Sequence, residues 1–418
     1  MAAPEHAPLS PVPFEVTEDD LAFALRACAG IHENERRIGD LVGDDEVLVT
    51  ASARAAFDLV LEGLRLAPGD EVLFTPTIGR MPDLARERGL GAVFVDLDPR
   101  TLAPALASLE AALGPRARVL VGTHLFGARA AMGDALRLAR SRGVVVVEDR
   151  AQAFHDPRDA GDPHADVVIH SFGVLKTASA LGGGLLRVRE PRLRRRVAEL
   201  HDAWPEQPAA SYARVVLGHL GARWLGRRRV HAAAVQAFER LGVDVDPLAL
   251  RIVAPAPSAR SRRQRPSRAL LAVLARRLQT FTPETLVARR EAVRRITDRL
   301  PPGLDHVGGS LAEHAHWVLP IVAPRPDALV SALRAAGLHA TRKLVHLESA
   351  PATPATGWLQ QIVYLPCFPR VDDAELARLL AVLGEHRGRR SHPECTSSSP
   401  PGTRRAPRAS HRGCPPMP

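Results

Sequence analysis

From residue 46 onward, short apolar runs alternate with longer segments whose apolar residues recur every three or four positions. The apolar runs predict strands at residues 46–50, 71–74, 92–95, 119–121, 144–147 and 167–169. The segments between them predict helices at residues 53–65, 81–88, 104–113 and 132–142. The strands are continuously apolar rather than alternating, which is typical of a parallel sheet with helices on both faces. We therefore expect an α/β fold with a mostly parallel sheet.

The pattern changes after residue 189. Residues 189–245 read as helical and basic, and could cover the sheet, form a subunit contact or present solvated faces. From about residue 269 we expect helices at 269–280, 284–299, 327–336 and 372–385 and strands at 317–322, 339–341 and 361–365. This order predicts a small α+β domain. We divide the chain into a flexible segment 1–14, a large α/β domain 15–250, a small α+β domain 251–386 and a disordered tail 387–418.

The formal net charge of +10 raises the question of a nucleic-acid partner. Much of the excess lies in the tail 387–418, which holds seven arginines and one acidic residue, and a second cluster at 260–268 reads as a linker or exposed loop. Aromatic residues make up 4% of the chain, and none alternates with these arginines as a base-stacking surface requires. We therefore expect no specific nucleic-acid binding.

Other features of the sequence indicate the cellular compartment of the protein. No apolar run reaches the roughly 18 residues that a membrane-spanning helix needs, and no secretory signal is visible. The four cysteines have no metal-site or disulfide spacing: Cys28, Cys367, Cys395 and Cys414. Reduced thiols of this kind are typical of a cytoplasmic protein.

Lysine occurs at two positions, Lys176 and Lys343, although the chain holds 56 lysine and arginine residues. Arginine supplies the same charge but cannot act as a neutral primary amine, which Schiff-base chemistry requires. Lys176 follows the apolar strand 167–169 and precedes the glycines at 182–184, a composition typical of close approach between backbone and ligand. A reactive amine and a solvated surface charge both remain open for Lys176.

Polar residues follow several strands at their carboxyl ends, where parallel sheets bind ligands. Ser52-Ala53-Arg54 opens a helix and suits a phosphate, although Ser52 could serve only as a helix cap. Asp149 ends the valine strand and needs a cation or a hydrogen-bond donor, unless it caps the following turn. His124 more often represents a packing residue than a catalyst at such a position.

In their order and spacing, these motifs resemble the DegT/DnrJ/StrS family of sugar aminotransferases between about residues 46 and 385. The resemblance rests on Pro68–Val72, Val93–Pro99, His124–Gly127, Glu148–Gln152, Ser171-Phe172 with Lys176, and Tyr364–Pro369. It implies the pyridoxal-phosphate-dependent transferase fold of aspartate aminotransferase, known as fold type I, with the cofactor pyridoxal 5'-phosphate.

The resemblance also implies roles for individual residues. Lys176 would form the internal aldimine with the cofactor and later move a proton, and Asp149 would pair with the pyridinium nitrogen. Gln152 would lie near the phenolic oxygen. The phosphate would be held by Ser171, Ser52 and the amides of Ala53 and Arg54. The reaction would transfer an amino group from a donor such as glutamate to a keto acceptor, such as a nucleotide-linked keto sugar, in a homodimer.

Several positions depart from the family pattern. Ser52-Ala53-Arg54 replaces the usual Ser-Gly-Thr, no aromatic follows Pro76 to stack on the ring, and the family's Gly-x-Asn-x-Arg segment is not recognisable between 200 and 245. A catalytically silent binding or regulatory subunit therefore remains an alternative. A dehydratase that uses the same cofactor is a further alternative, but Lys176 stands where that enzyme typically has histidine.

Overall fold

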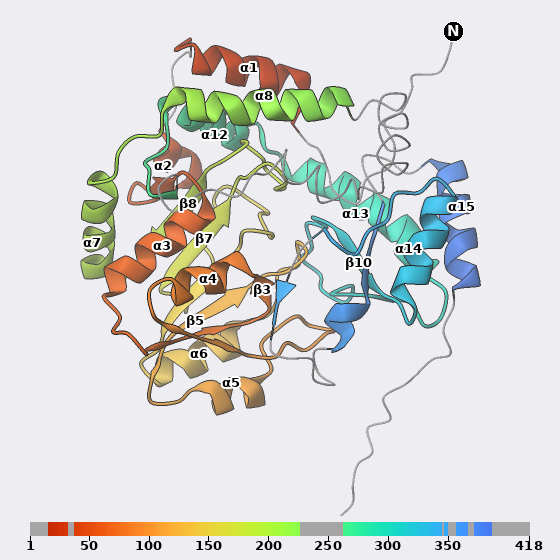
Figure 1. Ribbon diagram of the computed structural model, residues 1–418, viewed down its shortest axis with the longest axis horizontal. Coiled ribbons are helices and arrows are strands. Elements are labelled where there is room, and N and C mark those ends of the chain that lie inside the picture. The colour runs from red at the N-terminus through yellow and green to blue at the C-terminus, as the bar shows by residue number, and fades with distance from the viewer. Residues whose placement is uncertain are drawn as a thin grey trace, which may run out of the picture.

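The computed structural model of the chain describes residues 16–31, 37–225, 262–344, 347–349, 357–366 and 372–386. The segment expected at 1–14, the tail from 387, residues 226–245 of the basic stretch, and Cys367, Cys395 and Cys414 lie outside the described residues. Within the described part, a large α/β unit with a central sheet adjoins a smaller C-terminal unit (Figure 1).

The central sheet has seven strands in the order β1-β8-β7-β6-β5-β2-β4. Their bounds are β1 Leu48–Thr50, β2 Glu71–Phe74, β4 Gly91–Phe94, β5 Ala117–Thr123, β6 Val145–Asp149, β7 Val167–Ser171 and β8 Gly184–Val188. Strands β2, β4, β5, β6 and β7 pair in parallel, whereas β8 runs antiparallel to both of its neighbours. The expectation of a mostly parallel α/β sheet is confirmed, and β8 is a strand that the sequence analysis missed.

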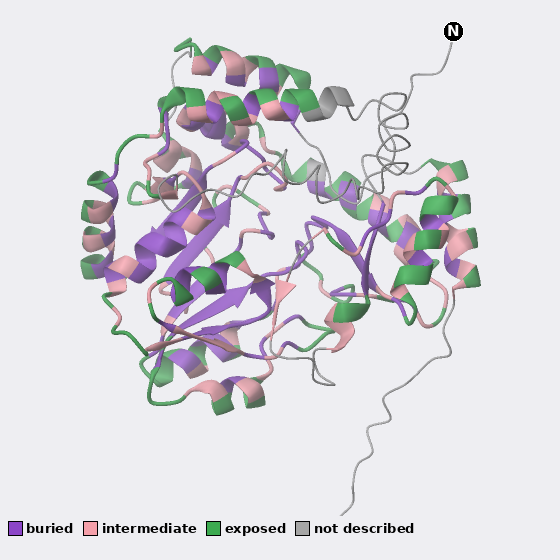
Figure 2. Cartoon of the chain, viewed as in Figure 1, coloured by how far each residue is buried: buried purple, intermediate pink, exposed green. Residues whose placement is uncertain are grey.

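Helices cover both faces of this sheet because successive strand residues point to opposite sides. On β2, Val72 and Phe74 pack in one apolar cluster with α3 (Ala53–Leu64), α4 (Arg80–Arg86) and α7 (Pro191–Asp202). Leu73 lies between them in sequence and packs in the opposite cluster, with α5 (Leu106–Ala112) and α6 (Gly133–Ser141). Buried residues therefore fill the sheet, while the outer helix faces are exposed (Figure 2).

A further helical layer covers the loops that follow β7. It consists of α1 (Glu18–Cys28), α2 (Ile38–Val42), α8 (Ala209–Leu225) and α12 (Arg268–Thr280). Helices α1 and α8 lie side by side (Figure 1) and, with α12, they enclose Phe172, Ala178 and Leu181. The helix expected at 269–280 is therefore present, and it packs on the large unit.

The C-terminal unit has its own apolar cluster around a three-stranded antiparallel sheet in the order β12-β10-β9. Its elements are α13 Pro283–Thr297, β9 Asp305–His306, β10 Leu319–Val322, α14 Pro326–Ala335, the 3-10 helix Gly357–Gln361, β12 Ile362–Leu365 and α15 Asp373–Glu385. The strand expected at 339–341 is wrong, since Thr341 makes one isolated bridge to Tyr364. A two-residue strand, β11 (Leu347–Glu348), pairs with β3 (Thr77–Ile78) and joins the two units.

The segment at 260–268, expected as a linker or exposed loop, lies against the large unit where it is described. Arg262 and Arg263 contact Asp58 on α3 at 3.6 and 3.0 Å, and Arg262 also contacts Glu87 at 2.6 Å. These ion pairs give Arg262 and Arg263 acidic partners on the large unit. Among the described residues, no helix is long and apolar enough to cross a membrane.

Candidate active site

Lys176 lies in the loop that follows β7, half-buried at the carboxyl edge of the sheet. Its backbone N–H donates to the Gly173 carbonyl at 3.0 Å, and its amine lies 4.3 Å from the centre of the Trp317 ring. The Trp317 indole N–H donates to the Leu175 carbonyl, which ties the C-terminal unit to this loop. Burial lowers the pKa of the Lys176 amine to about 8, and Asp149 opposes this shift while Arg54 adds to it.

Asp149 is the last residue of β6 and is 4% exposed. Strand β6 pairs in parallel with β7, so Asp149 lies at the same edge of the sheet as the lysine loop. One carboxylate oxygen accepts a hydrogen bond from the Ala151 amide at 2.9 Å, as a turn-capping aspartate would. Burial raises the pKa of Asp149, and the Ala151 amide and the charge of Lys176 oppose that rise. The carboxylate therefore both caps the turn and interacts electrostatically with the amine.

Gln152 is 2% exposed, and only one of the two polar atoms of its side chain has a hydrogen-bond partner among the described residues. Its Oε1 accepts a hydrogen bond from the Phe126 amide at 2.8 Å, and Phe126 has a left-handed backbone with φ 61°. Its Nε2 has no hydrogen-bond partner among the described residues. A buried donor without an acceptor is unfavourable, so this amide group is suited to bind an acceptor from outside the chain.

The start of α3 lies close to the glycines that follow Lys176. The Gly183 amide donates to the Ala51 carbonyl at 2.9 Å, and a Cβ at Gly184 would lie 2.8 Å from the Ala53 nitrogen. These glycines thus allow strand β8 to approach the start of α3. Ser52 caps α3, with its hydroxyl accepting from the Ala55 amide at 3.2 Å.

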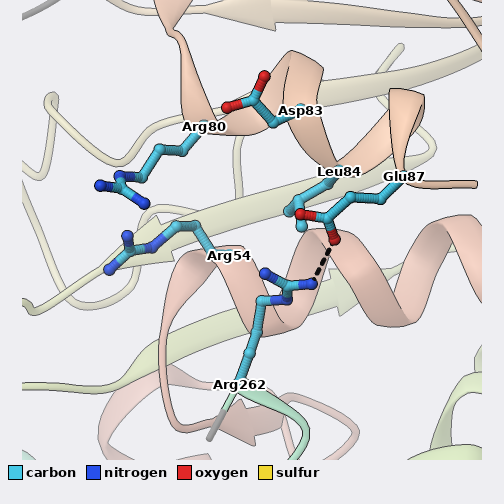
Figure 3. Close-up of a pocket in the computed structure, with 6 residues that line it drawn as sticks. All are labelled: Arg54, Arg80, Asp83, Leu84, Glu87 and Arg262. Carbon is cyan, nitrogen blue, oxygen red and sulfur yellow. Dashed lines mark hydrogen bonds and ion pairs between the residues drawn. The ribbon is translucent and has the colours of Figure 1, made fainter. Parts of the chain in front are cut away.

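Arg54 is half-buried and has no acidic partner among the described residues. It lines an open pocket together with Arg80, Asp83, Leu84, Glu87 and Arg262. The guanidinium groups of Arg54 and Arg80 extend to the same side of this pocket, while Arg262 pairs with Glu87 (Figure 3). Burial and the charges of Arg80 and Arg262 lower the pKa of Arg54 to about 10, so an anion here would relieve repulsion.

His124 has the structural role that we preferred for it. Its Nε2 interacts with the Glu148 carboxylate at 2.8 Å, and its Nδ1 accepts from the Ala130 amide at 3.0 Å. Both ring nitrogens are therefore engaged inside the protein, and the side chain is 1% exposed.

Ser171 is the last residue of β7 and is 8% exposed. Its Oγ lies close to the lysine loop, since a Cβ built on Gly173 would be 3.7 Å from this oxygen.

Two residues of this region were missed by the sequence analysis. Trp317 comes from the C-terminal unit, 141 positions after Lys176, so no local pattern links them; its rarity as one of four tryptophans was the available signal. Arg289 on α13 is buried and donates to the Thr177 hydroxyl at 3.4 Å and to the Ala315 carbonyl at 3.1 Å. It holds the lysine loop against the segment that carries Trp317.

The residues at this edge fit pyridoxal phosphate by their chemistry. The amine suits an aldehyde, the buried carboxylate suits a protonated ring nitrogen, and the Gln152 Nε2, which has no partner among the described residues, suits a ring oxygen. The start of α3 and the Arg54 guanidinium, for which the described residues provide no acidic partner, suit a phosphate. The individual assignments remain predictions.

Comparisons with known proteins agree with this fold. The model of the DegT/DnrJ/EryC1/StrS aminotransferase family matches residues 26–219. The aminotransferase TlmJ from Streptoalloteichus hindustanus is 20% identical, with a TM-score of 0.67 over 90% of this chain and 98% of that one. NtdA from Bacillus subtilis, solved with bound cofactor PMP, is 16% identical, with a TM-score of 0.64 over 91% and 85% of the two chains. The predicted fold of pyridoxal-phosphate-dependent aminotransferases is confirmed.

A curated relative is similar at the sequence level. The chain is 32% identical over 248 residues to the UDP-N-acetyl-3-dehydro-α-D-glucosamine 3-aminotransferase of Acidithiobacillus ferrooxidans, covering 54% of this chain and 66% of that protein. Matches to three other relatives cover 36 to 60% of their lengths. The chain thus aligns with about two thirds or less of these relatives. Residues 26–219 of the chain are therefore similar to the DegT/DnrJ/EryC1/StrS aminotransferase family.

Proposed function

We propose that the chain is a pyridoxal-phosphate-dependent aminotransferase that moves an amino group from an amino-acid donor to a keto acceptor. The observation that carries this proposal is the Lys176 amine, whose pKa is lowered to about 8 and which interacts electrostatically with the buried Asp149 carboxylate. A lowered pKa gives an amine a useful neutral fraction near neutral pH, as nucleophilic catalysis requires. When bound, the cofactor supplies an electron sink for a carbanion at the substrate carbon.

Each side chain of the proposed site would then have a separate role. Lys176 would hold the cofactor through its Nζ, which would also take and return the proton at the substrate carbon. Asp149 would keep a proton on the ring nitrogen, because a buried carboxylate stabilises a cation placed beside it. The Gln152 Nε2 would donate to the ring oxygen. The phosphate would be held by Ser171, Ser52, Ala53 and Arg54.

We propose a nucleotide-linked keto sugar as the acceptor. The name of the Acidithiobacillus relative, a UDP-sugar aminotransferase, supports this substrate class. We also propose a cytoplasmic homodimer. Leu217 and Leu220 on α8 are 54% and 40% exposed, and apolar residues on one helix face are suited to a subunit contact. Light scattering of the purified chain would measure the dimer directly.

The decisive experiment exploits the two lysines of the chain. Incubation with pyridoxal phosphate and then borohydride should leave one reduced adduct on Lys176, identified by peptide mass. Lys176→Ala should lose the adduct and the amino transfer, while Lys343→Ala is the matched control and should keep both. An adduct without transfer to any keto sugar would favour the silent-subunit alternative, and transfer by Lys176→Ala would refute the proposal.

A further inference from the structure

Three histidines gather beside the segment that carries Trp317. His306 ends β9, and His314 and His316 lie in the loop between β9 and β10. This loop rests on the large unit, where the Ala315 amide donates to the Gly127 carbonyl at 2.7 Å. The histidines therefore lie where the C-terminal unit meets the loop that follows β5.

The three rings are close enough to share one ligand. One nitrogen from each ring lies within 4.8 Å of the others. The rings of His314 and His316 stack with centroids 3.9 Å apart, and the His306 ring lies 5.8 Å from each. A Cβ at Gly309 would lie 2.6 Å from His306 Nδ1, so a glycine there lets the His306 ring take this position.

Each ring has one buried nitrogen that makes no hydrogen bond with the described residues. His306 Nε2, His314 Nε2 and His316 Nδ1 are buried and have no hydrogen-bond partner among the described residues. His314 is 2% exposed and His316 is 8% exposed. Buried polar atoms without partners are costly, and a bound ligand would satisfy those of His306 and His316 directly.

The donor set of this cluster suits a transition metal. The ligand atoms that lie within 4.8 Å of one another are all imidazole nitrogens. Neutral imidazole suits zinc, nickel and copper, whereas magnesium and calcium prefer oxygen ligands, which this group lacks.

We propose that His306, His314 and His316 bind one divalent transition-metal ion of the zinc class, with water completing its coordination. Three protein ligands with an open position are typical of many zinc sites. The nitrogens must move closer together as the ion binds, because zinc–nitrogen bonds are about 2.0–2.1 Å long. This site is separate from the proposed chemistry at Lys176 and does not depend on it.

His314 has to change its hydrogen bonding to take part. Its Nδ1 accepts from the His316 amide at 2.8 Å, which places its proton on Nε2. The ring must turn to offer a lone pair, and it gives up this backbone bond when it does. His306 and His316 need no such exchange, so they should contribute more to affinity than His314.

The ion would fix the position of Trp317. Trp317 directly follows His316, and its indole contacts both the Lys176 amine and the Leu175 carbonyl. A metal that holds His316 to His306 would therefore restrain the loop that brings Trp317 to the lysine. Its main effect should be on the stability of this junction.

The test is titration of the full-length, metal-stripped chain with Zn²⁺ and Co²⁺. Cys395→Ser and Cys414→Ser in all samples remove competing thiols of the tail. We expect one Zn²⁺ per chain, a visible Co²⁺ absorption band and a raised melting temperature. His306→Asn and His316→Asn should each weaken Zn²⁺ binding by more than tenfold, and His314→Asn should weaken it less.

His164→Asn is the matched control, because His164 lies near the surface and pairs with Asp162. It should bind Zn²⁺ like the parent chain. Circular dichroism checks that each variant is folded, and the Co²⁺ spectrum of the parent chain tests the site without any substitution in it. Absence of binding, or binding that all three histidine variants retain, would overturn the proposal, whether or not Lys176 accepts pyridoxal phosphate.

Discussion

Lys176 and its charged neighbours show how the chain sets the reactivity of one amine. Burial disfavours the ammonium form, Asp149 favours it, and Arg54 disfavours it further. Burial has the largest effect of the three, so the pKa falls to about 8 from the ordinary 10.5. The sequence identified the lysine by its rarity, but it could not give the balance of these effects, which depends on distances across the fold.

This balance predicts a pH dependence. The neutral amine is the nucleophile, so covalent capture of pyridoxal phosphate should accelerate as pH rises and reach half its maximum near pH 8. Asp149→Asn removes the charge that favours the ammonium form, which should move the midpoint lower. Arg54→Gln removes an opposing charge and should move it higher. Stopped-flow absorbance at constant ionic strength measures these midpoints, and identical midpoints in all three proteins would contradict this account.

At the scale of elements, the start of α3 combines a helix cap with a close backbone approach. The sequence predicted α3 within one residue of its observed end and located Ser52 at its start. It did not predict β8, because a strand that opens on Gly184 and carries the buried Arg187 lacks an apolar run. Arg187 is stabilised by Asp44 at 3.2 Å, a pairing across more than 140 residues that no local pattern contains.

Removing the Ser52 hydroxyl should separate its two proposed roles, which are capping α3 and binding the phosphate. Ser52→Ala loses the hydroxyl that accepts from the Ala55 amide and should lower the free energy of unfolding by about 1 kcal/mol. Asp372→Ala removes the cap of α15 and should cost a similar amount, far from the site. Only Ser52→Ala should also weaken binding of pyridoxal phosphate, measured by calorimetry beside urea unfolding. If both variants bound pyridoxal phosphate equally well, the role of Ser52 would be limited to capping α3.

The glycine at the start of β8 provides a second prediction at this scale. Gly184→Ala places a methyl group 2.8 Å from the Ala53 nitrogen, against backbone that cannot easily move. We expect a loss of about 1–3 kcal/mol in the free energy of unfolding, as for other overpacked positions. Gly221→Ala on α8 is a suitable control, since nothing lies within 4 Å of its added Cβ. Thermal unfolding of the two variants compares them directly.

For the molecule as a whole, ion pairs around Asp58 join segments far apart in the sequence. Asp58 on α3 is 2% exposed and contacts Arg88 at 2.6 Å and Arg263 at 3.0 Å. Burial alone would raise its pKa, but hydrogen bonds from Arg263 and Arg88 hold the pKa below its ordinary value. The sequence analysis interpreted the 260–268 segment, which includes Arg263, as a linker or exposed loop, because charge composition alone does not reveal a distant carboxylate.

A carboxylate with a lowered pKa stabilises the fold when it is ionised. Its contribution is present above the unfolded-state pKa of about 4 and is lost as pH falls through the lower folded-state value. Asp58→Asn should therefore lower the free energy of unfolding by about 1–2 kcal/mol at pH 7, with a smaller difference near pH 3. Urea unfolding at both pH values tests this, and an equal loss at both would point to packing rather than charge.

Trp317 has a consequence for how this protein can be recombined with its relatives. The tryptophan belongs to the C-terminal unit, yet it lies against the reactive amine and hydrogen-bonds to the loop beneath it. The two units are therefore not interchangeable modules, because a grafted C-terminal half would bring its own residue to that amine. A chimaera would need the 306–317 segment transplanted together with the lysine loop.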